Sequence, residues 1–348
     1  MIIKTITPVH IGNGKTYDPV CLNYDKVYSM DTILASLDAS TAVNKDLLNR
    51  LAYPGNRSLS KREFSNILGL DAFNYTNLDY LYEIDNHISN NSYEIQEAMK
   101  SLDKPIIPGS SLKGLIKNII IYDILKTNMK IKNRFSNINT LLSKNNELVS
   151  EVKDLYRFLI VPDITVNTNL SIYTGYRTSK NRLIPIKNLE TIPKGVESEV
   201  FNIQVDKGID RIDLTNKSDY YCETAKWLKN FENNFKKACY SFFKFVIKKE
   251  IESVQFIHFE DDISKYTYLK FLKQQDKALD EGHLILQIGK FTNFIDKSIL
   301  HVFDNYNELF KEYKLRPKGK NQKPIIESIN MIKINANVDM PLGYIEII

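Results

Sequence analysis

The chain has 348 residues and a formal net charge of +5 at pH 7; 43% of its residues are hydrophobic and 26% are charged. This hydrophobic fraction excludes a largely disordered protein, and the length predicts about two domains. A sequence pI of about 8.7 permits binding to a nucleic acid but lies below the strongly basic range typical of nucleic-acid-binding domains.

Cysteine and histidine usage argues against metal and disulfide chemistry. The three cysteines are widely spaced and form no CxxC pair, which indicates neither a zinc site nor a disulfide framework and suits a reducing compartment. The five histidines include no pair with metal-binding spacing. The sequence has no basic-then-apolar leader and no run of about 18 apolar residues, so we expect a cytoplasmic protein without a membrane span, metal or cofactor.

The first half of the chain predicts short strands, short helices and one long helix. Asp31 and Ser60 precede helical patterns and are expected to cap them. Residues 71–101 give no clear prediction, and residues 128–150 predict a loop or a short helix. The predicted strands cover residues 2–7 and 19–29, and the predicted helices cover residues 32–38, 61–68 and 110–127.

The second half predicts more strands and the strongest helix. Aromatic residues recur at three-and-four spacing over residues 219–249, which predicts a helix with a core-facing apolar stripe. Gly, Pro and basic residues over 174–195 predict a mobile basic connection. The other predicted elements are strands at 158–161, 163–166, 170–173, 199–205, 283–288 and 343–348 and a helix at 297–314. Because strands and helices do not alternate strictly, their order predicts an α+β fold rather than a doubly wound sheet.

Residues 107–117 read IPGSSLKGLIK and predict a tight turn that leads into a helix. Ser110 or Ser111 would cap the helix by accepting hydrogen bonds from its first N–H groups. Lys113 and Lys117 share one helix face. Such a helix start suits a phosphate, although an ordinary capped amphipathic helix with solvated lysines has the same pattern.

Residues 7–15 read TPVHIGNGK and predict a strand that ends in a Gly-Asn-Gly turn. Gly12 and Gly14 permit backbone conformations that other residues resist. A Lys-Thr pair follows Gly14, but the segment lacks the spacer and the ending of a nucleotide P-loop.

Basic residues are concentrated in two stretches. Residues 104–134 contain a single acid, Asp123, among several lysines, and residues 311–323 contain only Glu312. Such runs usually form solvated faces, but together with the glycine turns they favour a polyanionic partner.

These motifs resemble the RAMP superfamily of CRISPR proteins. The resemblance rests on TPVHIGNG, on IPGSSLKGLIK, on LQIGKFTNF at residues 286–294 and on the closing PLGYIEI at residues 341–347. Many relatives carry several glycines in the late loop, whereas this chain has only Gly289, so an ordinary turn that ends a core strand fits this loop equally well. The length, the motif order and the ending are most similar to the fifth Csm subunit of type III-A effector complexes.

The resemblance implies tandem ferredoxin-like (RRM-like) domains with inserted helices and loops, for which we expect boundaries at residues 1–150 and 151–348. It also implies a non-catalytic crRNA-binding subunit that caps the complex at the crRNA 3′ end and takes part in crRNA maturation and antiviral defence. The implied partners are crRNA, target RNA paired with it, the Csm backbone subunit and other Csm proteins; a host nuclease is left open.

The expected RNA contacts lie mainly on these motifs. Their backbone amides and lysines would hold phosphates without reading bases. The candidate RNA-binding residues are His10, Gly12, Asn13, Gly14, Ser110, Ser111, Lys113, Lys117, Arg177, Gly289 and Lys290.

Three other functions remain open. Some RAMP proteins cut precursor crRNA with a histidine, so His10 makes a metal-independent endoribonuclease the main alternative. A nucleotide-dependent enzyme would hold phosphates with residues 12–16, but the P-loop spacing is missing. A structural subunit without RNA contacts would direct its basic runs toward acidic protein surfaces.

Overall fold

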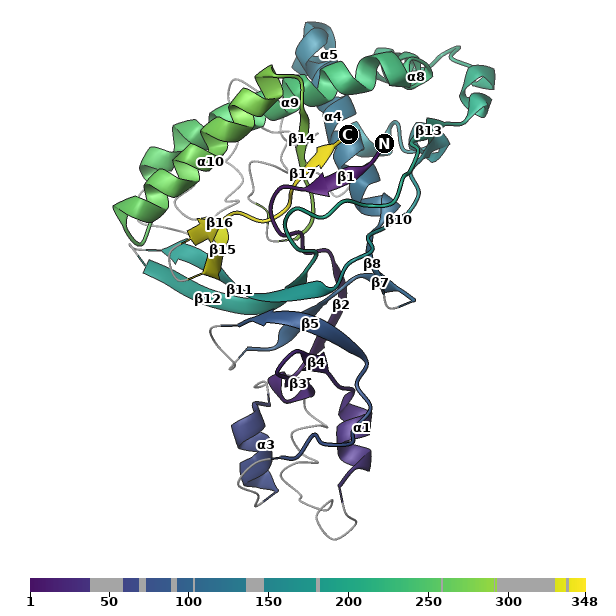
Figure 1. The fold of residues 1–348 in the computed structure, drawn as a ribbon. Coiled ribbons are helices and arrows are strands. Elements are labelled where there is room, and N and C mark those ends of the chain that lie inside the picture. The colour runs from purple at the N-terminus through teal and green to yellow at the C-terminus, as the bar shows by residue number, and fades with distance from the viewer. Residues whose placement is uncertain are drawn as a thin grey trace.

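The computed structural model describes residues 1–37, 59–68, 73–88, 93–102, 104–135, 147–179, 182–257, 259–290, 292, 329–335 and 338–348. Long helices cover one side of a curved central sheet, and a smaller lobe with two short helices extends from the other side (Figure 1). The two chain termini lie close together near the helical layer (Figure 1). The architecture is α+β, as the sequence predicts.

The central sheet is built around a long hairpin of β11 (Leu170–Ser179) and β12 (Arg182–Thr191). The strand order is β2-β6-β12-β11-β5-β4-β3, and β15 pairs with both β11 and β16. The bounds of the other strands are β2 Gly12–Tyr17, β3 Leu22–Asn23, β4 Lys26–Val27, β5 Tyr82–His87, β6 Ile95–Ala98, β15 Asn330–Asn335 and β16 Val338–Met340.

This hairpin corrects the prediction of a mobile connection at residues 174–195. The register shifts next to Gly175, where Tyr176 pairs with Pro185. A bulge tolerates proline and glycine that would disfavour a regular strand, because one residue there is left outside the ladder. The residues that resemble loop punctuation therefore mark an irregularity within two paired strands.

A second sheet joins the start and the end of the chain. It has the order β1-β17-β14, with β1 (Ile3–Thr5), β17 (Tyr344–Ile347) and β14 (Leu284–Gln287), and both pairings are antiparallel. The strands predicted at residues 2–7, 283–288 and 343–348 are thus confirmed. Two small sheets pair β10 (Ile164–Thr165) with β8 (Lys104–Ile107) and β7 (Lys100–Ser101), and β13 (Gln204–Val205) with β9 (Leu159–Ile160).

Strands from both sides of residue 150 share each of the two larger sheets. The expected division into residues 1–150 and 151–348 stays a prediction.

Four long helices form the layer above the sheets: α4 (Gly109–Thr127), α8 (Asp219–Lys229), α9 (Phe231–Ser253) and α10 (Asp262–Asp280). The helix predicted at 110–127 is confirmed. The helix predicted at 219–249 is two helices that meet at Asn230. The aromatic stripe is buried as predicted, and the rings of Tyr122 in α4 and Phe242 in α9 lie 5.1 Å apart.

The short helices are α1 Met30–Ala35, α3 Lys61–Ile67, α5 Met129–Arg134 and α7 Glu147–Ser150, with 3₁₀ turns η1 Pro19–Cys21, η2 Leu155–Phe158, η3 Lys207–Arg211 and η4 Val254–Phe256. Ser60 caps α3 in a capping box with Glu63, as its position predicts. The cap of α1 is Ser29 rather than Asp31, because the Ser29 hydroxyl accepts from the N–H of Thr32. The predicted helix at 297–314 and the basic run at 311–323 lie outside the described residues.

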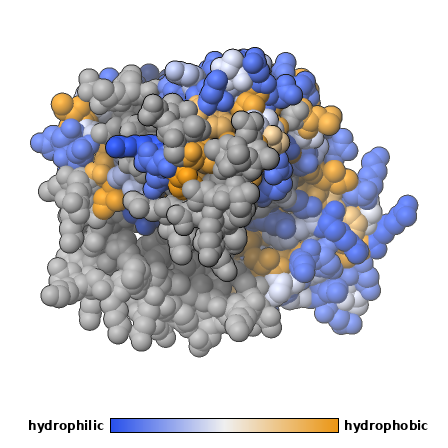
Figure 2. Space-filling model, turned by 90° about the horizontal axis from the view of Figure 1, so that it is seen from below, coloured by the Kyte–Doolittle hydropathy of each residue, from blue (hydrophilic) through white to orange (hydrophobic). Residues whose placement is uncertain are grey.

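The smaller lobe has its own apolar cluster, which includes Val20, Ile33, Phe64 and Tyr75. Seen from the side of this lobe, the described surface is largely hydrophilic with scattered hydrophobic residues (Figure 2). Among the described helices, none is both long enough and apolar enough to cross a membrane.

Candidate nucleic-acid interface

Three segments that are distant in the sequence line one cleft of about 440 Å³. They are the start of β2, one face of α4 and the turn that follows β14. The lining residues are Ile11, Gly12, Ser111, Gly114, Leu115, Asn118, Gln287, Ile288, Gly289 and Lys290. The cleft therefore brings together the three glycine-containing motifs that the sequence singles out.

Backbone hydrogen bonds hold the two loops together. The N–H of Lys290 donates to the carbonyl of His10 at 2.8 Å. The N–H of Ile288 donates to the carbonyl of Gly343 at 2.8 Å, and the N–H of Gly343 donates to the carbonyl of Pro8 at 2.9 Å. The early loop, the late loop and the closing strand thus form one backbone unit beside the cleft.

Gly289 is required by this close packing. Its φ is +100°, which L side chains rarely adopt, and a Cβ there would lie 2.5 Å from the His10 carbonyl oxygen. The loop is therefore a tight turn against the early motif.

The start of α4 corrects the prediction that Ser110 or Ser111 caps the helix. The N-cap residue is Pro108, which makes no side-chain cap. The carboxylate of Asp163 instead accepts from the N–H of Gly109 at 2.8 Å. A Cβ at Gly109 would lie 2.1 Å from the Val161 carbonyl oxygen, so only glycine allows this approach.

This capping changes where an anion can bind. A carboxylate already lies at the helix N-terminus, so a phosphate at the same place would meet a like charge. Ser110 is exposed near this end, whereas Ser111 points toward the cleft lining. The part of α4 available to a ligand at the cleft is its side, not its end.

Gly114 and Asn118 on that side were missed as candidate residues. Gly114 is exposed, and a Cβ there would meet nothing within 4 Å. A glycine inside an otherwise apolar helix was the signal that could have identified it, because glycine weakens a helix interior by about 1 kcal/mol relative to alanine.

Lys113 and Lys117 lie on a different flank of α4 from Gly114 and do not line the cleft. Partial burial, and then the charge of Lys117, lower the pKa of Lys113. The Lys117 ammonium lies 5.1 Å from the centre of the Tyr156 ring. Among the described residues, no carboxylate lies within ion-pair distance of either lysine.

His10 is fully buried, and its Nδ1–H donates to the backbone carbonyl of Glu190 at 2.7 Å. Burial lowers the pKa of His10 to about 4, so the imidazole is neutral at neutral pH. The ring lies beneath Gly12, where a Cβ would be 3.1 Å from Nε2. This geometry supports a role in positioning the two loops and offers no exposed ring for an RNA contact or for general acid–base chemistry.

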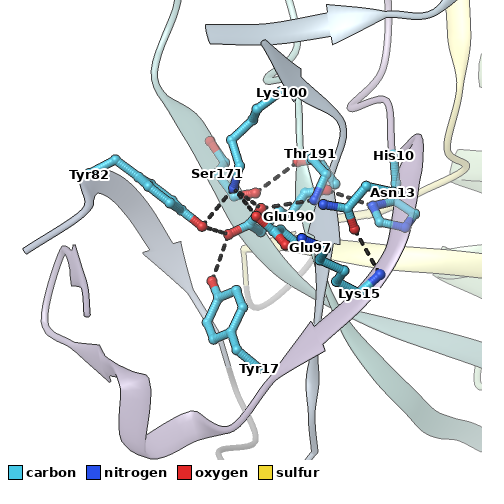
Figure 3. Close-up of polar contacts among 11 residues, drawn as sticks. His10, Asn13, Lys15, Tyr17, Tyr82, Glu97, Lys100, Ser171, Glu190 and Thr191 are labelled. Atoms are coloured by element: carbon cyan, nitrogen blue, oxygen red, sulfur yellow. Dashed lines mark hydrogen bonds and ion pairs between the residues drawn. The ribbon is translucent and has the colours of Figure 1, made fainter. Parts of the chain in front are cut away.

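Glu190 of β12 is the centre of a buried polar network under the early loop (Figure 3). Its Oε1 accepts hydrogen bonds from the hydroxyls of Tyr17 at 2.7 Å and Tyr82 at 2.6 Å. Its Oε2 accepts from the N–H of Ala98 and from the Lys100 ammonium, each at 2.9 Å. One carboxylate thus connects β2, β5, β6 and β7 to β12.

Asn13 joins the early loop to the edge of this network (Figure 3). Burial acts to raise the pKa of Glu97, but hydrogen bonds from Asn13 and Lys100 outweigh it, so the pKa is lowered. Asn13 Oδ1 also accepts from the N–H of Lys15 at 2.8 Å. Gly14, at the exposed bulge of β2, has a φ of +90° and open space around it.

Lys290 supplies positive charge to the cleft. Its ammonium donates to the Gln96 side-chain oxygen at 2.9 Å, which holds it beside the early loop. Arg177 lies elsewhere, exposed on β11, where its Nε–H donates to Asn330 Oδ1 at 3.3 Å. Of the predicted residues, the cleft brings together Gly12, Ser111, Gly289 and Lys290.

Within the described part of the chain, no group of three or more His, Cys, Asp or Glu residues is arranged to hold a metal ion.

The fold and the cleft define an α+β protein whose early, middle and late glycine-containing segments meet at one site. The model of the RAMP superfamily matches residues 2–294, and the chain therefore belongs to the RAMP superfamily. None of the curated protein sequences matches this chain.

Two solved structures share this fold over the whole chain. One is a chain of a cryo-EM structure of a Csm–crRNA–target RNA ternary complex from a type III-A CRISPR–Cas system, with a TM-score of 0.67, 20% identity, and coverage of 99% of this chain and 98% of that chain. The other is the crystal structure of Csm5 from T. onnurineus, with a TM-score of 0.61, 20% identity, and coverage of 99% and 100%.

Proposed function

We propose that this protein is a non-catalytic, crRNA-binding subunit of a type III-A Csm effector complex that caps the complex at the crRNA 3′ end. The membership of the RAMP superfamily and the shared fold with Csm5 support this proposal. The observation that carries it is the cleft, because it joins the glycine loops of residues 12 and 289 to α4 and Lys290.

The cleft suits a sugar–phosphate backbone better than a base. Its open side is formed by small residues, with the half-buried Gly12 and the exposed Gly114 near the Lys290 ammonium. Contacts of this kind fix the position of a nucleic acid without reading its sequence. The guide sequence would then be read by base pairing with target RNA, and this subunit would contribute to crRNA maturation and antiviral defence by holding the guide end.

The α4 lysines extend this interface. Lys113 and Lys117 carry no carboxylate partner within the described residues, and Lys113 is already partly desolvated. Phosphates that replace this lost solvation would release counterions, so RNA affinity should fall with salt by a slope of about 0.7 per phosphate contacted.

The test compares RNA binding by Lys113→Gln/Lys117→Gln and Lys290→Gln variants with a control, Lys270→Gln/Lys273→Gln. The control lysines are exposed on α10, away from the cleft. We expect both site variants to lose affinity and salt dependence for single-stranded RNA while the control keeps both. Wild-type protein that binds no RNA, alone or when purified from its host with Csm-type partners, would refute the proposal.

The second candidate is a metal-independent RAMP endoribonuclease that uses His10. The motif favours it, but the ring is buried and its pKa is lowered to about 4. Incubation of repeat RNA with the protein in EDTA decides between the two functions. Cleavage that His10→Gln abolishes, in a variant that still binds RNA, would establish the nuclease; intact RNA would leave the binding function.

A further inference from the structure

A second cleft of about 710 Å³ lies between η2, η3 and the start of α8. It shares no lining residue with the first cleft. Its lining residues are Asp154, Arg157, Phe158, Gly208, Arg211, Ile212, Asp213, Thr215, Lys217 and Tyr221.

Aromatic rings support two of the three cations in this cleft. The Arg157 guanidinium lies 4.8 Å from the centre of the Phe158 ring, and the Lys217 ammonium lies 4.9 Å from that of Tyr221. A cation–π contact attracts the charge without neutralising it. These side chains are therefore positioned while their charge and N–H groups remain available to an anion.

The two carboxylates of the cleft are engaged by neutral donors. Asp154 Oδ2 accepts from the Tyr221 hydroxyl at 2.7 Å, and Asp213 Oδ1 accepts from the N–H of Thr215 at 2.8 Å. Those Thr215 hydrogen bonds lower the pKa of Asp213. Among the described residues, no carboxylate forms an ion pair with Arg157, Arg211 or Lys217.

Gly208 brings the second arginine to the cleft. A Cβ at Gly208 would lie 2.8 Å from Asp206 Oδ1 and 3.0 Å from Phe158 Cε1, so glycine allows η3 to pack against that ring. Arg211 ends this 3₁₀ turn and lines the same cleft as Arg157. Two guanidinium groups are therefore presented together, the arrangement best suited to the oxygens of a phosphate.

This cleft is connected to the basic flank of α4. Lys117 contacts the ring of Tyr156, and Tyr156 precedes Arg157 in η2. A polyanion that follows Lys113 and Lys117 along α4 would next reach η2. This continuity favours a nucleic-acid backbone over an isolated acidic side chain of a protein.

We propose that the cleft formed by Arg157, Arg211 and Lys217 binds phosphate groups of the RNA backbone, as a second anchoring site beyond the Gly12–Gly289 cleft. The choice of RNA rests on the proposed function. Two anchoring sites on one strand would fix its direction across the subunit, which a single site would leave less constrained.

The test measures single-stranded RNA affinity over a range of salt concentrations for the full chain. Arg157→Gln/Arg211→Gln is compared with Lys270→Gln/Lys273→Gln, which removes the same charge from α10, on the opposite side of the molecule from β13 (Figure 1). We expect the arginine variant alone to lose about tenfold in affinity at low salt and about 0.7 of the salt slope per phosphate released. Ultraviolet cross-linking should attach RNA to peptides from η2 or η3.

The outcomes separate the two proposals. Equal affinity and slope in the two double variants, with RNA binding still sensitive to Lys290→Gln, would overturn the second site and leave the proposed function standing. Loss of a co-purifying protein subunit with an unchanged salt slope would identify the cleft as a protein contact and would also overturn it. A wild-type chain that binds no RNA would refute both.

Discussion

Replacing Gly289 by alanine should destabilise the protein strongly, because two independent costs meet at this position. Its φ of +100° is unfavourable for any residue with a Cβ, at about 1–2 kcal/mol. The new Cβ would also lie 2.5 Å from the His10 carbonyl oxygen, so the backbone must move. That movement stretches the hydrogen bond from the Lys290 N–H, which adds about 1–3 kcal/mol if the carbonyl is left unsatisfied.

The matched control is Gly14→Ala. Gly14 has a similar φ of +90°, but a Cβ there would meet nothing within 4 Å. Gly14→Ala therefore carries only the backbone cost, about 1–2 kcal/mol, and the difference between the variants isolates the close approach at about 1–3 kcal/mol.

Urea-induced unfolding, followed by circular dichroism and by the fluorescence of the tyrosines and Trp227, measures both free energies of unfolding. The lower midpoint should belong to Gly289→Ala, with a similar slope in both variants. Equal losses would show that the packing of the late loop against His10 contributes nothing to stability. In that case the close approach to His10 would not explain why the late loop keeps its single glycine.

Two further predictions concern the first cleft. Gly114→Ala should stabilise the protein by about 0.5–1 kcal/mol, because the position is helical and open, yet weaken RNA binding by filling the cleft wall; thermal unfolding and RNA titration should move in opposite directions, and unchanged affinity would place the RNA away from α4. Wild-type stability should fall as pH drops from 6.5 toward 4, because the folded state holds His10 with a pKa of about 4 while the unfolded chain takes up the proton near 6.5. The loss should approach about 3 kcal/mol relative to His10→Gln, and parallel pH profiles of the two proteins would contradict it.

The local elements were predictable from the sequence where one segment decides its own structure. The helix at residues 110–127, the capping box of Ser60 and the aromatic stripe of α9 follow from periodicity and capping residues. The three motifs also identified segments that meet at one cleft, because the pairing of β1 with β17 and β14 places them together.

The errors arise where a distant segment decides. Asp163 caps α4 from 54 positions along the chain, so the serines beside the helix start had no signal against them. The hairpin of β11 and β12 contains a bulge next to Gly175 and Pro185, and these residues have the composition of a loop. Glu190 lies in a polar-looking strand, and nothing in its neighbours indicates that two tyrosines, a backbone N–H and a lysine converge on it.

The glycines distinguish what the fold needs from what a ligand needs. Gly109, Gly289 and Gly343 each face a backbone oxygen closer than a Cβ allows, so the packing of this chain alone explains them. Gly114 meets no atom within 4 Å and weakens its helix, so nothing inside the described chain accounts for it. An open, flexible residue on the wall of the cleft is accounted for if a molecule must approach the helix closely there. For this reason the side of α4, rather than its N-terminus or the late loop itself, is the part of the interface where a change should alter binding without a cost in stability.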